Sequence, residues 1–108
     1  MSRNNIQARI KKIAEQIGKR YKPEKVILFG SYAHGTHTEH SDIDLLVIKN
    51  TRASRVERFV QVKRLIYDPQ LRIPEVYTPA EIKKRLKMGD DFLNDILREG
   101  KVLYEAGS

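Results

Sequence analysis

Two short groups of polar residues, separated by a loop, carry the side chains best suited to chemistry. Gly30 and Ser31 follow an apolar run, and after ten further residues Asp42 and Asp44 begin a second apolar run. A glycine and a serine at the start of a helical turn offer backbone N–H groups and a hydroxyl to a phosphate. Two carboxylates about 7 Å apart along one face of a strand suit Mg²⁺, which prefers oxygen ligands. The spacing predicts an anion site beside a metal site, which is the minimum that moving a nucleotidyl group requires.

Two predicted strands position these groups, one over residues 25–29 and one over residues 42–48. Their pairing would bring Ser31 and the aspartates to the same end of a sheet. Strand alternation places Asp42 and Asp44 on one face and Ile43, Leu45 and Val47 on the other. Asp42 alone could be explained as turn chemistry. Asp44 could not, because burying a carboxylate without a partner is costly, so we expect a metal or ligand there.

With these motifs, the chain resembles the polymerase-β nucleotidyltransferase superfamily, whose signature is a hydrophobic residue, Gly and Gly or Ser, followed by a loop and Asp-x-Asp. It is most similar to the minimal nucleotidyltransferase family, the small stand-alone members. The resemblance implies a palm-like core over the single domain 1–108. It also implies ATP as substrate and two Mg²⁺ ions, with Gly30 and Ser31 binding the nucleotide and Asp42 and Asp44 acting as catalytic metal ligands.

Two-metal transfer requires a third carboxylate, and the resemblance implies one on the strand before a Thr-Pro helix start. Glu75, three residues before Thr78, is the only acid in that predicted strand. We therefore assign Glu75 as the third catalytic and metal-binding residue, with a possible role as general base. Two alternatives remain open: Glu75 is an exposed edge-strand residue, or Asp68, in an Asp-Pro turn, supplies the carboxylate.

The remaining pattern predicts helices around this core. Isoleucines at helical spacing predict a first helix over residues 6–21, ended by Pro23, and a second helix is expected over 53–67. A strand over 72–77 should lie at an edge because it contains Pro74. Thr78, Pro79 and Glu81 predict a capped helix start, a last helix follows Gly89, and residues 101–105 form a short strand or tail. The order predicts an α/β (α+β) fold, a small mixed sheet with helices covering one face.

Composition narrows the class of protein. The 108 residues carry 21 Lys and Arg against 14 Asp and Glu, a formal net charge of +7, and no cysteine. Disulfides and thiolate zinc sites are therefore excluded, and the basic excess favours anionic partners without choosing among them. The sequence has no apolar run of membrane-spanning length and no secretory leader, so we expect a cytoplasmic protein that does not enter membranes.

The chain is too short to hold a large acceptor by itself, so we expect a partner to bring it. The resemblance implies an antitoxin beside a HEPN-domain RNase toxin, which is silenced by transfer of AMP from ATP to a tyrosine hydroxyl. Two alternatives stay open: a non-catalytic antitoxin that masks its partner sterically, and an enzyme that acts on an RNA 3′ end. Nucleic acid is the less favoured partner, because no basic stretch interleaved with aromatic residues is present to stack bases.

Overall fold

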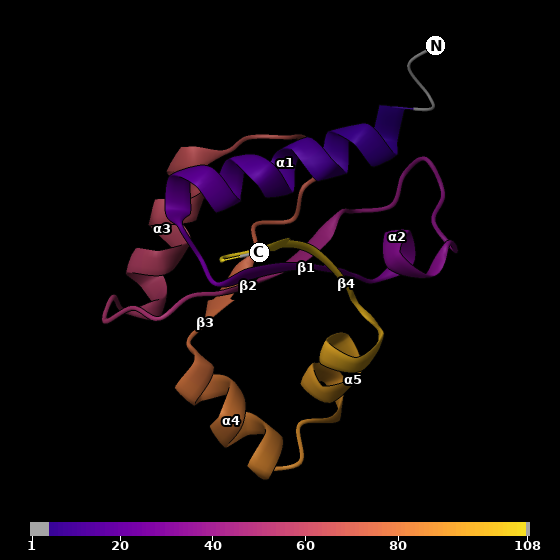
Figure 1. Ribbon diagram of the computed structural model, residues 1–108. Helices are drawn as coiled ribbons and strands as arrows, with labels where there is room; N and C mark the ends of the chain where they lie inside the picture. Colours follow the sequence, from indigo (N-terminus) through magenta and orange to yellow (C-terminus); the bar gives the residue numbers. More distant parts are fainter. Residues whose placement is uncertain (1–4, 108) are drawn as a thin grey trace.

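The computed structural model describes residues 5–107, which form five helices and four strands (Figure 1). In chain order these elements are α1 (Ile6–Tyr21), β1 (Lys25–Phe29), α2 (Ser31–His34), β2 (Asp44–Ile48), α3 (Arg55–Leu65), β3 (Glu75–Tyr77), α4 (Pro79–Lys87), α5 (Asp91–Glu99) and β4 (Lys101–Glu105). The α/β class and the mixed sheet are as predicted.

The four strands form one sheet in the order β3-β2-β1-β4. β1 pairs antiparallel with both β2 and β4, whereas β2 and β3 run parallel. In the register of β1 and β2, Phe29 lies opposite Asp44. The residues that follow Phe29 and those that precede Asp44 therefore lie at the same end of the two central strands, as the sequence predicted.

One face of the sheet is covered by α1 and α3. Four isoleucine or alanine side chains of α1 and Val62 of α3 pack with alternate residues of the central strands, among them Val26, Leu28, Leu45 and Val47. The buried positions of α1 recur at helical spacing, which is the pattern that predicted this helix. This cluster fixes the orientation of β1 and β2, and so of the loop between them.

The opposite face is covered by α4 and α5, which corrects the expectation that helices cover one face only. Ile82, Leu93 and Ile96 of these helices pack on Ile27 and Leu46 of the central strands. Figure 1 shows α1 and α3 on one side of the sheet and α4 and α5 on the other. The physical reason lies in the strand sequences: uninterrupted apolar runs, unlike alternating ones, are typical of strands buried on both faces.

The predicted cap of α4 is confirmed. Thr78 accepts a hydrogen bond from the Glu81 N–H, and the Glu81 carboxylate accepts one from the Thr78 N–H. The strand before it is shorter than expected, because β3 begins only after Pro74, which has no N–H to donate. β3 lies at an edge of the sheet, as its proline predicted.

Residues 101–105 form a strand rather than a tail. β4 pairs with β1, and its Tyr104 packs against Gly18 of α1. A Cβ at Gly18 would lie 2.3 Å from Tyr104 Cδ1, so only a glycine permits this approach of helix and strand. The first helix and the last strand are therefore locked together.

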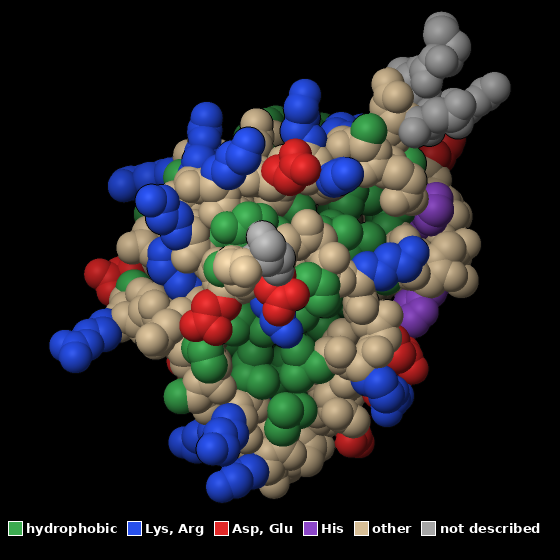
Figure 2. All heavy atoms as spheres, viewed as in Figure 1, with side chains coloured by type: hydrophobic (Ala, Val, Ile, Leu, Met, Phe, Trp, Pro, Cys, Tyr) green, Lys and Arg blue, Asp and Glu red, His purple; other side chains and the backbone are tan. Residues whose placement is uncertain are grey.

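The surface is strongly basic in two regions. In Figure 2, Lys and Arg side chains lie over α1 and over α4, while hydrophobic side chains gather between them near β4. Val102 of β4 is 49% exposed.

Within residues 5–107, none of the helices has the length and hydropathy needed to cross a bilayer.

Candidate active site

Gly30 brings the turn after β1 into contact with Asp44. The glycine has φ 77° and ψ −156°, a conformation that side-chain-bearing residues rarely adopt. A Cβ at this position would lie 2.5 Å from Asp44 Oδ2. The two motifs that the sequence separates by a loop therefore meet atom to atom, and the glycine is required both by the backbone conformation and by the carboxylate beside it.

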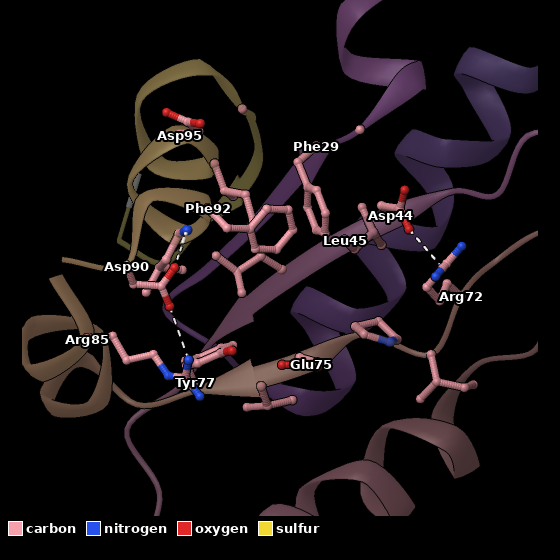
Figure 3. Close-up of a pocket in the computed structure, with 18 of the residues that line it drawn as sticks. Phe29, Asp44, Leu45, Arg72, Glu75, Tyr77, Arg85, Asp90, Phe92 and Asp95 are labelled. Atoms are coloured by element: carbon pink, nitrogen blue, oxygen red, sulfur yellow. Dashed lines mark hydrogen bonds and ion pairs between the residues drawn. The ribbon is translucent and has the colours of Figure 1, made fainter. Parts of the chain in front are cut away.

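Asp42 and Asp44 converge on one guanidinium. Arg72 Nη2 lies 2.7 Å from Asp42 Oδ2, and Arg72 Nε lies 3.1 Å from Asp44 Oδ1. Figure 3 shows the pair of Asp44 and Arg72 at one end of a cavity. The side chain of Asp44 is only 20% exposed, compared with 52% for Asp42. The two carboxylates thus form one anionic centre that already holds a cationic group.

Burial raises the pKa of the Asp44 carboxyl above its ordinary value, an effect that the Arg72 guanidinium opposes and the Asp42 carboxylate increases. Desolvation and a neighbouring like charge both penalise an ionised carboxylate, and a bound cation relieves both. The donors are carboxylate oxygens, the ligand type that Mg²⁺ prefers. The centre therefore fits a divalent metal, with Asp42 and Asp44 as ligands.

The turn after β1 is the predicted phosphate-binding element. Ser31 begins the four-residue helix α2, in which the N–H groups of Ala33 and His34 donate to the Gly30 carbonyl at 3.0 and 3.2 Å. The N–H groups at a helix start have no intrahelical acceptor, so those of Ser31 and Tyr32 can serve a ligand. Ser31 thus directly follows Gly30, the residue that lies against the Asp44 carboxylate, although Ser31 itself does not line the cavity.

Gln70 fastens the loop that leads to the aspartates, a role that sequence reasoning missed. Its Nε2 donates to Tyr32 Oη at 3.1 Å and to the Ser41 carbonyl at 3.2 Å. Its own carbonyl accepts from the Ile43 N–H at 2.8 Å, and Arg9 of α1 donates to its side chain. Gln70 and Arg72 lie on either side of Leu71, which pairs with Ile43 and continues the parallel pairing of β2 and β3. This pairing brings both residues to the site from a distant segment, so no sequence motif includes them.

Glu75 lies on the same face of the sheet as Asp44. It pairs with Leu46, two residues after Asp44 on the neighbouring strand, which puts the two Cα atoms about 8 Å apart. Its carboxylate, however, lies 3.5 Å from Arg55 Nη2 and is 68% exposed. Within residues 5–107, no three His, Asp or Glu side chains are grouped to hold a metal ion. Asp42 and Asp44 are thus brought together, whereas Glu75 faces another partner.

Asp68, the alternative third acid, is engaged elsewhere. Its Oδ2 lies 2.9 Å from Arg9 Nε, and its other oxygen accepts from the Gln70 N–H at 2.9 Å. It does not line the cavity that contains Asp44. Of the two candidates, only Glu75 lines the cavity that contains Asp44.

The cavity beside Asp44 has a volume of about 1160 Å³ and extends along β2 and β3 beneath α5. At the far end from Arg72, Arg55 and Arg85 lie over the ring of Tyr77, with guanidinium carbons 5.3 and 5.4 Å from its centroid. Figure 3 shows Glu75 between Tyr77 and Asp44. The lining thus carries guanidinium groups at both ends and carboxylates from β2, β3 and the α5 side, so it offers groups that can bind phosphate directly and groups that can bind a cation.

Comparison with known proteins bears on this geometry. A nucleotidyltransferase domain family matches residues 10–104. Two curated relatives from Methanocaldococcus jannaschii carry the name "Putative protein adenylyltransferase". MJ0604 is 32% identical over 102 residues, which are 93% of this chain and 99% of the relative. MJ1305 is 36% identical over 84 residues, 74% of this chain, and this match spans 57% of that relative's length.

Two solved structures share the fold. One, from Sulfolobus solfataricus and described as a "putative nucleotidyltransferase", gives a TM-score of 0.64 at 24% identity and covers 93% of this chain and 84% of its own. The other, a toxin-antitoxin with AMP-PNP, gives 0.59 at 22% identity and covers 91% and 74%. The family match extends over both motifs and reaches into all four strands, and the chain belongs to the nucleotidyltransferase domain family.

Proposed function

We propose that this chain is a Mg²⁺-dependent protein adenylyltransferase that acts in the cytoplasm. Its substrate is ATP, and its acceptor is a tyrosine hydroxyl of a partner, a HEPN-type RNase toxin that the transfer silences. The observation that carries the proposal is the close approach of Gly30 and Asp44 beside the Asp42 carboxylate. It supports a phosphate-binding role for the Gly-Ser turn and a metal-binding role for the two carboxylates. The names of the two curated relatives support a protein as acceptor.

In the proposed reaction, the acceptor oxygen bonds to the α-phosphorus of ATP while the bond to pyrophosphate breaks. Asp42 and Asp44 would hold Mg²⁺, and Glu75 would turn from Arg55 to complete the set for a second ion. The metal supplies charge neutralisation of the triphosphate and activation of the attacking hydroxyl. Gly30 and Ser31 grip the outer phosphates, and Glu75 or water takes the proton that the acceptor hydroxyl loses.

Exposed apolar residues near the cavity support a protein partner. Met88, after α4, is 75% exposed, and Phe92 of α5 is 67% exposed and lines the cavity. Phe59 of α3, also in the cavity lining, is 45% exposed. Large apolar side chains at the rim of a polar site are typical of surfaces that bind another protein. An acceptor docked on these helices would present its hydroxyl to the same cavity.

The test is transfer of label from α-phosphate-labelled ATP in Mg²⁺, with and without the protein encoded by the adjacent reading frame. Label on that partner is expected, with loss of at least about 100-fold in Asp44→Asn, which keeps the size of the side chain but weakens the metal site. The control is Asp91→Asn, the same change at an exposed position on α5 outside the cavity.

Each result has a distinct meaning. Equal transfer by Asp44→Asn and the unaltered chain would refute the assignment of the site. Label on RNA rather than on protein would favour the RNA 3′-end reaction. A tight complex with the partner and no label on either would favour a steric antitoxin, and Glu75, paired with Arg55, would be the first residue to examine.

A further inference from the structure

The side chain of Arg72 bridges the two carboxylates that the proposed function assigns to a metal. We propose that Arg72 is a built-in counter-cation for the Asp42 and Asp44 carboxylates, which holds them together in the metal-free protein and is displaced when a divalent cation binds. This inference rests on the proposed metal-dependent function. It adds a residue that positions the ligands and sets the affinity of the site, and no sequence motif includes that residue.

The contacts of Arg72 show how one side chain serves two carboxylates. Its Nη2 reaches Asp42 at 2.7 Å and its Nε reaches Asp44 at 3.1 Å. The guanidinium presents several N–H groups in a fixed plane, so it can donate to two carboxylates at once, whereas a lysine ammonium is a compact charge without this fixed geometry. Among the described residues, Arg72 is the only basic side chain within ion-pair distance of either aspartate.

The backbone of Arg72 is fixed, whereas its side chain is free to leave. The Arg72 N–H donates to the carbonyl of Ile43, the residue between the two aspartates, at 3.1 Å. The side chain, in contrast, is 67% exposed and lies at the rim of the cavity. It can therefore swing into solvent without disturbing the pairing of the segment that carries it. A cation at the oxygens that Arg72 contacts would require this movement.

The consequence is competition between Arg72 and the metal. If the metal-binding state is only the fraction of molecules in which Arg72 has left, the apparent metal affinity is lowered by that fraction. Exposed ion pairs are weak, so the expected effect is modest, about fivefold in dissociation constant. Arg72 would thus keep the two carboxylates together without a metal and lower the apparent affinity of the site for a metal.

The test is titration of the full chain with Mn²⁺, followed by calorimetry, in the absence of nucleotide. Arg72→Gln is expected to bind Mn²⁺ about fivefold more tightly than the unaltered chain. Arg72→Lys keeps the charge but cannot bridge both carboxylates, so it should also bind more tightly. The control is Arg98→Gln, since Arg98 Nη2 also contacts two carboxylates, Asp95 at 2.9 Å and Glu99 at 3.2 Å. Arg98 does not line the cavity, and it forms no ion pair with Asp42 or Asp44.

A second measurement uses thermal unfolding in EDTA and in excess Mg²⁺. The rise in Tm that Mg²⁺ produces should be larger in Arg72→Gln than in the unaltered chain, and unchanged in Arg98→Gln. Unchanged or weaker Mn²⁺ binding in Arg72→Gln, or no binding by any form, would overturn the inference. If Mn²⁺ binding by Arg72→Gln is unchanged or weaker, label transfer that depends on Asp44 would still uphold the proposed function. Failure of this inference and failure of the proposed function are therefore distinguishable.

Discussion

Replacement of Gly30 by alanine should damage both the fold and the chemistry. The backbone conformation at Gly30, φ 77° and ψ −156°, costs a residue with a side chain about 1–3 kcal/mol. The added Cβ would also lie 2.5 Å from Asp44 Oδ2, so the carboxylate must move. We expect a loss of about 3 kcal/mol, which lowers the Tm of a domain this size by about 12 °C. A displacement of about 1 Å at a reacting group can reduce transfer about 100-fold.

The matched control is Gly35→Ala, because Gly35 has the same φ of 77° but no heavy atom within 4 Å of an added Cβ. Its left-handed conformation should cost about 1–2 kcal/mol with transfer retained. Thermal unfolding and label transfer measure the two effects separately. In an Asp44→Ala background the clash is absent, so Gly30→Ala should cost less than it does in the unaltered chain. An equal cost in both backgrounds would refute the close contact as the cause.

Three further predictions concern the residues that support the site. Arg58→Met should cost about 3 kcal/mol in urea unfolding, because this buried guanidinium donates to the Val76 carbonyl and to Glu81, whereas the exposed Arg64→Met should stay within about 0.5 kcal/mol. Hydrogen bonds from Arg58 lower the pKa of Glu81 in the folded protein. The ionised Glu81 carboxylate therefore stabilises the fold above the ordinary glutamate pKa, and this stabilisation is lost as pH falls through the lowered pKa of Glu81. Tm should therefore fall less between about pH 5 and pH 3 in Glu81→Gln than in the unaltered chain, and an identical fall would contradict this. Gln70→Ala should speed amide exchange in residues 36–42 and reduce transfer about tenfold, with about 1 kcal/mol lost, and equal exchange rates would exclude Gln70 as the fastening residue.

The parts of the fold that depend on local chemistry could be predicted from the sequence. The spacing of Ile10, Ile13 and Ile17 predicts α1 because buried positions of a helix recur with its own period. The cap at Thr78 is equally local, since it involves residues three apart. Both expectations agree with the structure. The second helical layer was not predicted, although the continuous apolar sequences of β1 and β2 contain a signal for it.

The supporting residues of the site could not be predicted, because they depend on pairing between distant segments. Gly30 and Asp44 are connected by an antiparallel register that the motif spacing suggests. Arg72, in contrast, meets the aspartates only because β2 and β3 run parallel, and parallel pairing leaves no turn signal in the sequence. The partner of Glu75 is Arg55, a surface pair that no pattern marks. The roles of the site residues themselves remain predictions.

The contact of Gly18 with Tyr104 has a consequence for how the chain folds during synthesis. β1 lies in the interior of the sheet and needs β4 on one side, but residues 101–105 leave the ribosome about 70 residues after β1 is complete. Until then, the strand that carries the Gly30 turn has one open edge, which is a template for pairing with other chains. Substitution of Gly18 would keep this edge of β1 unpaired for longer, because a side chain at position 18 would prevent Tyr104 of β4 from packing against α1. Such a variant should aggregate during expression more than its equilibrium stability suggests.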